Sequence, residues 1–324
     1  MRQTLLVTLT SLLMIIFIPI ILLVPLDESE KESLVLVIDY LPPKDAGSTI
    51  VKVGTQEGVL TMDLEEYLVG VVLSEMPPSF DTEALKAQAV AARTFACKQI
   101  ADGKHKEFDL CTLSTCCQAW NAVEEMEQKF GNSAELFLKK AGQAVKETVG
   151  EVLCYNNEFI DAVYFSCSGG TTEDAVAVWG TEVPYLQSVA SGGEELSSCY
   201  RSELRITHEQ FAQTIGRYNS DVLLNRDPIY WIEDIERTEG DGVKRICIGG
   251  VWFSGPELRS AFGLKSTKFT VSVEEQDIVF HVLGYGHRVG MSQYGANAMA
   301  KTGKTYREIL QYYYSGVEIN RKKP

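Results

Sequence analysis

The stretch DLEEYLVGVVLSEMPPSFDTEALKAQAVAARTF, residues 63–95, predicts two helices joined by a tight turn. Asp63 and Asp81 each stand just before a helical pattern, where a short acidic side chain caps a helix N-terminus. The pair Pro77-Pro78 cannot continue the first helix, because proline lacks the backbone N–H that a helix needs. We therefore expect one helix before the prolines and a second helix after Asp81.

Glu75 continues the apolar face of the first predicted helix. Five apolar residues recur there at i, i+3, i+4, i+7 and i+8, and Glu75 stands at i+11; they are Leu64, Tyr67, Leu68, Val71 and Val72. Burial on this face and the negative end of the helix dipole both disfavour a carboxylate anion, so we expect a raised pKa. A general acid that works near neutral pH holds its proton in this way. The alternative is a glutamate that is simply solvated at a fraying helix end.

The second predicted helix carries two cations on one face. Lys86 and Arg93 share this face, whereas Gln88 falls among alanines on a face that we expect to be buried. If the two cations lie near Glu75 across the proline turn, they lower its pKa and oppose the effect of burial. The alternative is that both cations are solvated on the helix surface.

The rest of the chain predicts a mixed α+β fold with two parts. Residues 49–205 and 271–324 combine strand and helix patterns, and we expect them to form the main domain. Residues 206–270 hold short strand patterns around glycine-rich turns, so we expect a smaller β-rich subdomain inserted in the main one. Near the C-terminus, Thr305 with Glu308 three residues later predicts a capped helix.

Residues 1–26 predict a single transmembrane helix. From Thr4 to Leu26 the chain has no charged residue, and about 20 apolar residues suffice to cross a bilayer core. Arg2 before this segment and acidic residues after it place the N-terminus in the cytoplasm and the body of the protein outside it. Residues 27–48 are then a polar stalk. A cleaved signal peptide is the alternative, although the apolar stretch is long for one.

The charge of the chain excludes one class of partner. The sequence holds 44 acidic and 30 basic residues, which gives a formal net charge of −14. A nucleic-acid-binding protein needs a basic surface for the phosphate backbone, and the composition does not indicate one. A carbohydrate partner carries little charge and is compatible with this composition.

Four candidate metal ligands lie close together in the sequence: His105, Cys111, Cys116 and Cys117. Three thiolates and an imidazole complete the tetrahedral coordination of a zinc ion, so we expect a structural site that fixes this loop. Adjacent cysteines seldom bridge to each other without strain. The alternative is disulfide pairing in an oxidising compartment, for instance between Cys97 and one of the three.

Three blocks stand out in order along the chain. They are Ser74-Glu75-Met76-Pro77 followed by residues 83–94, EALKAQAVAART; Phe165-Ser166-Cys167-Ser168-Gly169-Gly170; and residues 284–296, GYGHRVGMSQYGA. Together these blocks closely resemble the stage II sporulation protein D family, and the resemblance extends over most of residues 50–320. The chain departs from the family at Phe165 and Cys167, where many relatives have His and Thr, and at Arg288, where some have Gly.

The resemblance implies an enzyme, a lytic transglycosylase that cleaves the bond between N-acetylmuramic acid and N-acetylglucosamine in peptidoglycan. It implies that Glu75 is the catalytic acid and that Arg93 belongs to the catalytic residues, so that the main domain is the catalytic domain. The 6-hydroxyl of the muramic acid then captures the anomeric carbon and leaves a 1,6-anhydro end, and no cofactor is needed. A hydrolase would require a second carboxylate, for which Asp161 and Glu173 are the candidates.

By analogy with the family, ten residues line or support the glycan-binding site: Lys86, Gln88, Ser168, Gly169, Gly170, Tyr285, His287, Ser292, Gln293 and Tyr294. The glycines suit a close approach of the backbone to a sugar, because they have no side chain.

The resemblance also implies a setting and partners. The expected setting is the septal or engulfing membrane during engulfment of the forespore. The expected partners are peptidoglycan strands, an amidase that removes stem peptides and a multispanning membrane protein. Related proteins include enhancers of cell-wall amidases, so a non-catalytic glycan-binding module is the alternative function. A scaffold that tethers partners at the septum is a third.

Overall fold

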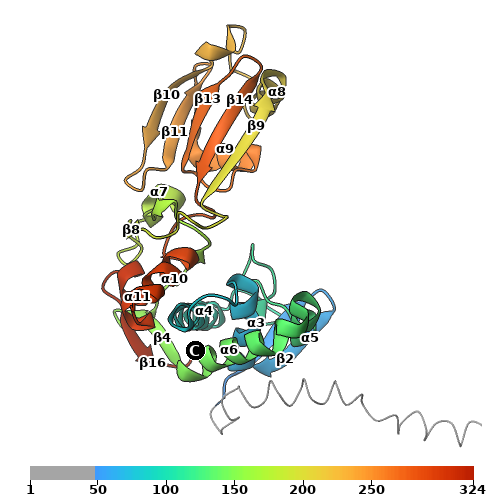
Figure 1. Cartoon of the computed structure of the whole chain (residues 1–324), viewed down its shortest axis with the longest axis vertical. Helices are drawn as coiled ribbons and strands as arrows, with labels where there is room; N and C mark the ends of the chain where they lie inside the picture. The colour runs from blue at the N-terminus through green and yellow to red at the C-terminus, as the bar shows by residue number, and fades with distance from the viewer. Residues whose placement is uncertain (1–47) are drawn as a thin grey trace, which may run out of the picture.

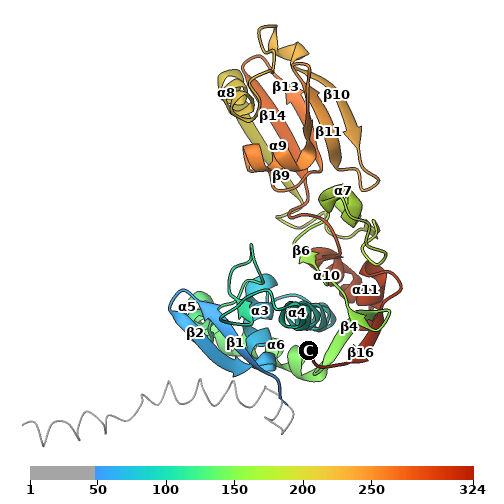
Figure 2. The same cartoon turned by 180° about the vertical axis from the view of Figure 1, so that it is seen from behind.

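The computed structural model describes residues 48–324, which form a mixed α+β molecule with several small sheets, as expected. Both views show an elongated molecule with a helical part at one end and a β-rich part at the other (Figures 1 and 2). The expected anchor, residues 1–26, and the expected stalk, apart from Ser48, lie outside the described residues. Among the described residues, no helix combines the length and the hydrophobicity that a bilayer crossing requires.

Both helices predicted from residues 63–95 are present, and a β-hairpin precedes them. The Asp63 carboxylate caps the first helix by accepting a hydrogen bond from the Glu65 backbone N–H at 2.8 Å. Asp81 caps the second helix in the same way, and Gly103 ends it in the left-handed conformation. These elements are β1 (Ile50–Thr55), β2 (Gly58–Asp63), α3 (Leu64–Glu75) and α4 (Thr82–Asp102).

Helix α4 lies at the centre of the main hydrophobic core. Its alanines from Ala84 to Ala96 are fully buried, and these small side chains let neighbouring helices approach closely. The expected apolar face of α3 is buried too, and each large apolar side chain in such a core contributes roughly 1.5–3 kcal/mol. Figure 1 shows the elements around α4: α3, α6 (Ala134–Glu147), α10 (Gln293–Lys301), α11 (Tyr306–Tyr313), and β4 (Glu151–Tyr155), which pairs with β5 (Glu158–Phe159) and β16 (Glu318–Arg321).

Two short pairings join the second and third sequence blocks. Strand β6 (Tyr164–Phe165) runs parallel to β15 (Met291–Ser292). Cys167 and Tyr285 exchange backbone hydrogen bonds at 3.1 and 2.7 Å. Blocks that are more than a hundred residues apart in the chain therefore lie side by side. The other short elements of this part are β3 (Leu110–Cys111), α5 (Val123–Phe130), η1 (Gly131–Ser133), β7 (Gly170–Thr171), α7 (Ala175–Trp179) and β8 (Ala190–Ser191).

A second hydrophobic core lies in the β-rich part. Aromatic side chains such as Phe211 and Phe280 pack between its sheets and helices. Its strands extend from residue 201 to residue 283, on both sides of the expected segment 206–270, and the division into domains stays a prediction. Its elements are β9 (Arg201–Thr207), α8 (His208–Tyr218), η2 (Pro228–Tyr230), β10 (Ile232–Arg237), β11 (Val243–Ile248), β12 (Val251–Ser254), α9 (Gly255–Phe262), β13 (Phe269–Val273) and β14 (Asp277–Leu283), in the sheets β10-β11-β12 and β13-β14-β9.

Candidate functional site

Glu75 is the last residue of α3 and is only partly exposed to solvent. Its Oε1 accepts a hydrogen bond from the backbone N–H of Ala119 at 2.8 Å. Burial raises the pKa of the Glu75 carboxyl, while the hydrogen bond from the Ala119 N–H and the nearby Gln293 side chain partly offset this rise. The raised pKa predicted from the helical pattern is confirmed, so this carboxyl keeps its proton to higher pH than a solvated glutamate does.

The loop before α5 forms one wall of the Glu75 site. The side chain of Gln118 accepts a hydrogen bond from the Tyr164 hydroxyl at 2.8 Å and donates to the carbonyl of Ala92 on α4 at 3.3 Å. Burial, together with the nearby Glu75 charge, holds the pKa of Tyr164 well above its usual range. Tyr164 is therefore a neutral hydrogen-bond donor, and the loop that carries Ala119 is fixed to the central helix.

The third block contributes Gln293 to the same site. Gln293 begins α10, is almost completely buried, and lies close enough to Glu75 for its side chain to lower the pKa of that carboxyl. Its Nε2 also lies 3.5 Å from Oε1 of Gln88 on α4. Gln88 is fully buried, as its position among alanines predicts, and its own Nε2 has no hydrogen-bond partner among residues 48–324. Gln88 thus supports Gln293 and does not itself face solvent.

Ser168 and Ser292 meet on the buried carboxylate of Glu194. The Ser292 and Ser168 hydroxyls donate to Oε1 of Glu194 at 2.7 and 3.0 Å, and the Ser168 backbone N–H donates to Oε2 at 2.7 Å. Ser191 donates a further hydroxyl hydrogen bond at 2.5 Å. A Cβ on Gly295 would collide with this carboxylate, so only glycine fits there. Because both hydroxyls are occupied and fully buried, Ser168 and Ser292 support the site and do not line it.

His287 and Tyr285 lie on the outer side of this junction. The His287 Nδ1 accepts from the Val289 N–H at 3.1 Å, so the proton is on Nε2, which donates to the Tyr164 carbonyl at 3.1 Å. Burial lowers the pKa of His287 to about 4, and the ring is neutral at pH 7. The exposed ring of Trp179 lies 5.5 Å from the His287 ring, and Tyr285 is exposed as well.

Three further predicted residues lie around these contacts. Gly169 and Gly170 have φ angles of 70° and 104°, and a Cβ on Gly169 would lie 2.8 Å from the Leu283 carbonyl carbon. Tyr294 is partly exposed and packs edge-to-face on Phe80 at 4.9 Å, next to the proline turn. The glycines therefore allow the second block to pack against the start of the third.

Arg93 is neither beside Glu75 nor solvated on the helix surface, the two alternatives left open by the sequence. Its guanidinium is buried and forms a bidentate ion pair with Glu65, at 2.9 Å from Nε and 2.5 Å from Nη2. It also donates to the Glu151 carbonyl at 3.1 Å. At 3.6 residues per turn, Arg93 points about 140° round α4 from Gln88, the residue of this helix that contacts the Glu75 site.

Lys86 does not reach Glu75 either. Its ammonium group lies 2.7 Å from Glu83 and 2.5 Å from Glu147, and these contacts raise the pKa of Lys86 despite partial burial. Neither Lys86 nor Arg93 is among the groups that shift the pKa of Glu75. Burial therefore decides the pKa of Glu75 without opposition from the two cations.

The two candidates for a second carboxylate are engaged elsewhere. Glu173 is buried in an ion pair with Arg288 at 3.1 Å. Asp161 accepts a hydrogen bond from the Tyr185 hydroxyl at 3.3 Å. Among the acidic side chains that the structure describes, none is among the groups that shift the pKa of Glu75. The site therefore offers one carboxyl group, which suits an acid that acts without a carboxylate partner.

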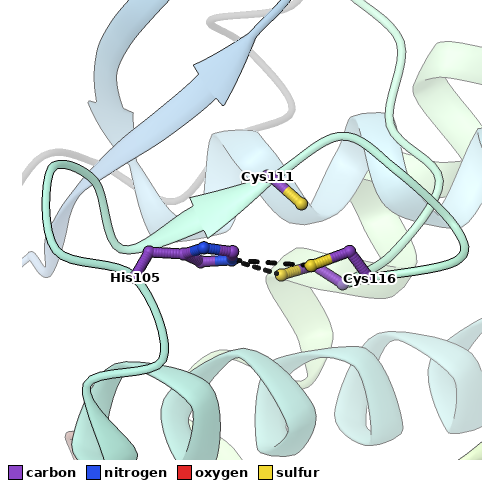
Figure 3. Close-up of side chains that lie close together, drawn as sticks. His105, Cys111 and Cys116 are labelled. Atoms are coloured by element: carbon purple, nitrogen blue, oxygen red, sulfur yellow. Dashed lines mark hydrogen bonds between the residues drawn. The ribbon is translucent and has the colours of Figure 1, made fainter.

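The four expected metal ligands converge, and their ligand atoms all lie within 4.8 Å of one another. Figure 3 shows His105 facing the cysteine thiols; its Nε2 lies 3.3 Å from the Cys117 Sγ and 3.8 Å from the Cys116 Sγ. A tetrahedron with Zn–S bonds of about 2.3 Å has ligand-to-ligand distances of roughly 3.5–3.8 Å, so the four groups fit a zinc ion. All eight cysteines have free thiols, and Cys97 is outside the cluster. This cluster could therefore bind a metal.

Fold and site together define a mixed α+β protein in which a half-buried glutamate ends a core helix beside two joined glycine-bearing blocks. The model of the stage II sporulation protein family matches residues 53–155. The chain is 39% identical over 268 residues to stage II sporulation protein D of Bacillus subtilis (strain 168), and 36% identical over 269 residues to that of Bacillus amyloliquefaciens; each match covers 82% of this chain and 76% of the relative. An amidase enhancer of Bacillus subtilis is 29% identical over 311 residues, 78% of this chain and 40% of the enhancer. The chain therefore belongs to the stage II sporulation protein D family, as its three blocks predict, and is a sporulation protein.

Proposed function

We propose that this protein is a membrane-anchored lytic transglycosylase that cleaves the MurNAc–GlcNAc bonds of peptidoglycan and leaves 1,6-anhydro-MurNAc ends. The supporting observation is a single half-buried carboxyl group, that of Glu75, whose pKa is raised by burial. The side chain of Gln293, from the third block, lowers the pKa of this carboxyl group, so the acid is adjacent to a segment expected to support the glycan.

In this mechanism, protonated Glu75 donates its proton to the glycosidic oxygen, and the bond between that oxygen and the anomeric carbon of MurNAc breaks. The 6-hydroxyl of the same MurNAc then forms a bond to the anomeric carbon. Its proton returns to the Glu75 carboxylate, which restores the acid. Between the two transfers, the Ala119 N–H and the Gln293 side chain stabilise the carboxylate, and no second carboxyl group is required.

The Cys₃His cluster holds a structural zinc ion in this proposal. His105, Cys111, Cys116 and Cys117 would fill all four tetrahedral positions, so the ion would have no open position for substrate. Ala119 follows Cys117 by two residues, and its N–H contacts Glu75. The site would therefore fix the loop that holds the acid.

The proposed setting follows from the apolar segment 1–26 and from the family. The N-terminus is cytoplasmic, the body is extracytoplasmic, and the protein acts at the septal or engulfing membrane during engulfment. An amidase that removes stem peptides and a multispanning membrane protein are the proposed partners.

The test is digestion of purified peptidoglycan by the full chain, with mass spectrometry of the products. Wild-type protein should release fragments with 1,6-anhydro ends, and Glu75→Gln should lower their rate of release at least about 100-fold, the usual contribution of a general acid. Glu57→Gln, exposed in the β1–β2 turn, is the matched control and should keep full activity. Reducing ends without anhydro ends would mean hydrolysis and contradict the proposal.

A non-catalytic glycan-binding enhancer of an amidase is the second candidate, because an amidase enhancer is among the relatives. This function predicts that Glu75→Gln stimulates a cell-wall amidase as well as wild type does. It also predicts that neither protein releases anhydro ends on its own. The two activities are measured on the same peptidoglycan preparation, with and without the amidase.

A further inference from the structure

A pocket of about 340 Å³ opens on the β-rich part of the molecule. Three cationic residues line it, Arg201, Arg237 and Lys268, together with His281 and a single acid, Asp241. Its lining carries more cations than acids in a chain whose net charge is −14, and one further acid, Glu203, borders it at 3.4 Å from His281.

The pocket lies on the sheet face that points away from the second hydrophobic core. Phe280 and Val282 of β14 are buried in that core, and His281 between them is exposed. Since side chains alternate across a strand, His281 points to the opposite face. Arg201 and Leu283 are paired on the neighbouring strands β9 and β14, and both line the pocket. Its floor is thus a rigid, paired sheet.

The charges in the pocket are only partly compensated. Asp241 lies 3.2 Å from the Lys268 ammonium and 3.7 Å from the Arg237 guanidinium, and so holds both cations in place. Among the side chains that the structure describes, no acid pairs with Arg201, and the Arg201 guanidinium lies over the Tyr200 ring, 5.3 Å from the centre. The Arg201 guanidinium is therefore available to an anion, in a pocket where Asp241 already holds the other two cations.

The pocket adjoins the two glycine-bearing blocks. Leu283 lines the pocket, and its backbone is in contact range of Gly169 in the second block. Arg201 directly follows Tyr200, whose carbonyl accepts a hydrogen bond from the Gly284 N–H at 2.9 Å. A polymer that follows these blocks would therefore pass the pocket.

We propose that this pocket binds a carboxylate carried by the glycan strand. Guanidinium and ammonium groups bind carboxylates through charge-assisted hydrogen bonds, and an arginine fork can hold both oxygens at once. The inference rests on the proposed function for the identity of the polymer. The carboxylate has two sources: the lactyl group of muramic acid once the stem peptide is removed, and the stem peptide itself.

Binding is measured with the full chain in detergent micelles, in a Glu75→Gln background so that no strand is cleaved. The probes are glycan strands with free lactyl carboxylates, the same strands after conversion of those carboxylates to methylamides, and strands with intact stem peptides. Arg201→Gln and Lys268→Gln should each weaken binding of the carboxylate strands about fivefold and flatten its salt dependence. Binding of the methylamide strands should not change.

Arg217→Gln is the matched control, because Arg217 is exposed on α8 and does not line the pocket. Melting temperatures of all variants establish that they are folded. If the substitutions weaken only the binding of peptide-free strands, the pocket binds the lactyl carboxylate. If they weaken only the binding of peptide-bearing strands, the pocket binds a carboxylate of the stem peptide. Either result supports the inference.

Three results would overturn it: equal affinity for carboxylate and methylamide strands, an equal loss in Arg217→Gln, or tighter binding of a phosphate polymer than of any glycan. Failure of the proposed enzymatic function is a separate result. It would appear as missing anhydro ends in the wild-type digest, whereas the charge dependence of binding would persist.

Discussion

Glu75 ends a helix whose inward-facing side chains are otherwise apolar, and this placement sets the pH at which its carboxyl group loses its proton. Because burial raises the pKa, cleavage should continue above the ordinary glutamate range and fall as pH rises through the pKa of the folded protein. Initial rates of anhydro-end release across about pH 4 to 9 give the pH–rate profile and locate its falling limb, the pH range over which activity is lost. A limb near the ordinary value of about 4.3 would contradict the assignment.

The Gln293→Leu variant should shift the falling limb of this pH–rate profile in a direction that can be predicted. The Gln293 amide favours the charged form of the Glu75 carboxyl and lowers its pKa, so removal of this amide should raise the pKa further. The falling limb should then move to higher pH. A merely structural role for Gln293 would lower the rate at every pH and leave the limb where it is.

The raised pKa of Glu75 also gives stability a pH dependence of known sign. A carboxyl group with a higher pKa in the folded state contributes stability fully below its unfolded pKa, and this contribution is lost as pH rises through the folded pKa. The Glu75→Gln variant has no ionisable group at this position and does not lose this contribution. Its stability relative to wild type should therefore increase as pH rises from about 4 to 8. Urea unfolding midpoints at several pH values measure the difference, and a constant offset would disagree with it.

Arg93 has a structural role in this protein, and its variants should show that. Arg93→Gln leaves the Glu65 carboxylate without its buried partner, which should lower the free energy of unfolding by about 3–5 kcal/mol. The double variant Glu65→Gln with Arg93→Gln should recover part of this loss. Urea unfolding gives the stabilities, and assays at low temperature give the activity of the folded fraction. A large loss of activity without a loss of stability would restore the catalytic role expected from the family.

At the scale of the elements, local signals in the sequence sufficed for the helices around the site. Asp63, Asp81 and Thr305 cap α3, α4 and α11 as expected, because capping depends on residues only a few positions apart. The buried face of α3 follows from its 3.6-residue period, and with it the raised pKa of Glu75. The sequence pattern therefore shows which face of α3 is buried, although the burial itself comes from packing in the tertiary fold.

Contacts between distant segments could not be predicted in the same way. Glu194 stands in the sequence Gly192-Gly193-Glu194-Glu195, which is typical of an exposed turn, and nothing local indicates that three serines would surround it. The partner of Arg93 could not be predicted either, because Glu65 lies on another helix. Tyr164 offered a weak signal, since it directly precedes the second block.

The loop from β3 to α5 links the metal cluster to the acid, and removal of one ligand should affect both. Cys116→Ser should reduce bound zinc from one ion per chain to well below one and lower the melting temperature, because a three-ligand site no longer closes. Elemental analysis and thermal unfolding measure these changes. Cys247→Ser, on β11, is the control and should keep its zinc. Purified wild-type protein without zinc, or with a disulfide in the cluster, would contradict the prediction.

At the scale of the whole molecule, one buried ion pair connects the helical and β-rich parts. Arg288 pairs with Glu173 and also donates to the Ser168 and Gly240 carbonyls at 2.8 and 2.5 Å. Glu173 in turn accepts from the Gly242 N–H at 3.1 Å, and a Cβ on Gly242 would collide with this carboxylate. These hydrogen bonds therefore hold the turn between β10 and β11 against the second block. The ion pair thereby sets the orientation of the pocket that contains Arg201 relative to that block.

Removal of this ion pair should loosen the turn between β10 and β11. Arg288→Met leaves Glu173 buried without a counter-ion, at a cost of about 3–5 kcal/mol, and amide exchange at residues 238–242 should accelerate while exchange in α4 stays slow. Arg288 has a φ of 66°, so Arg288→Gly removes the same pair but relieves backbone strain of about 1–2 kcal/mol. It should therefore be the more stable of the two variants, although its turn is equally loose. Equal exchange rates in wild type and both variants would mean that the turn is held by its other contacts, and the coupling between the two parts would have to lie elsewhere.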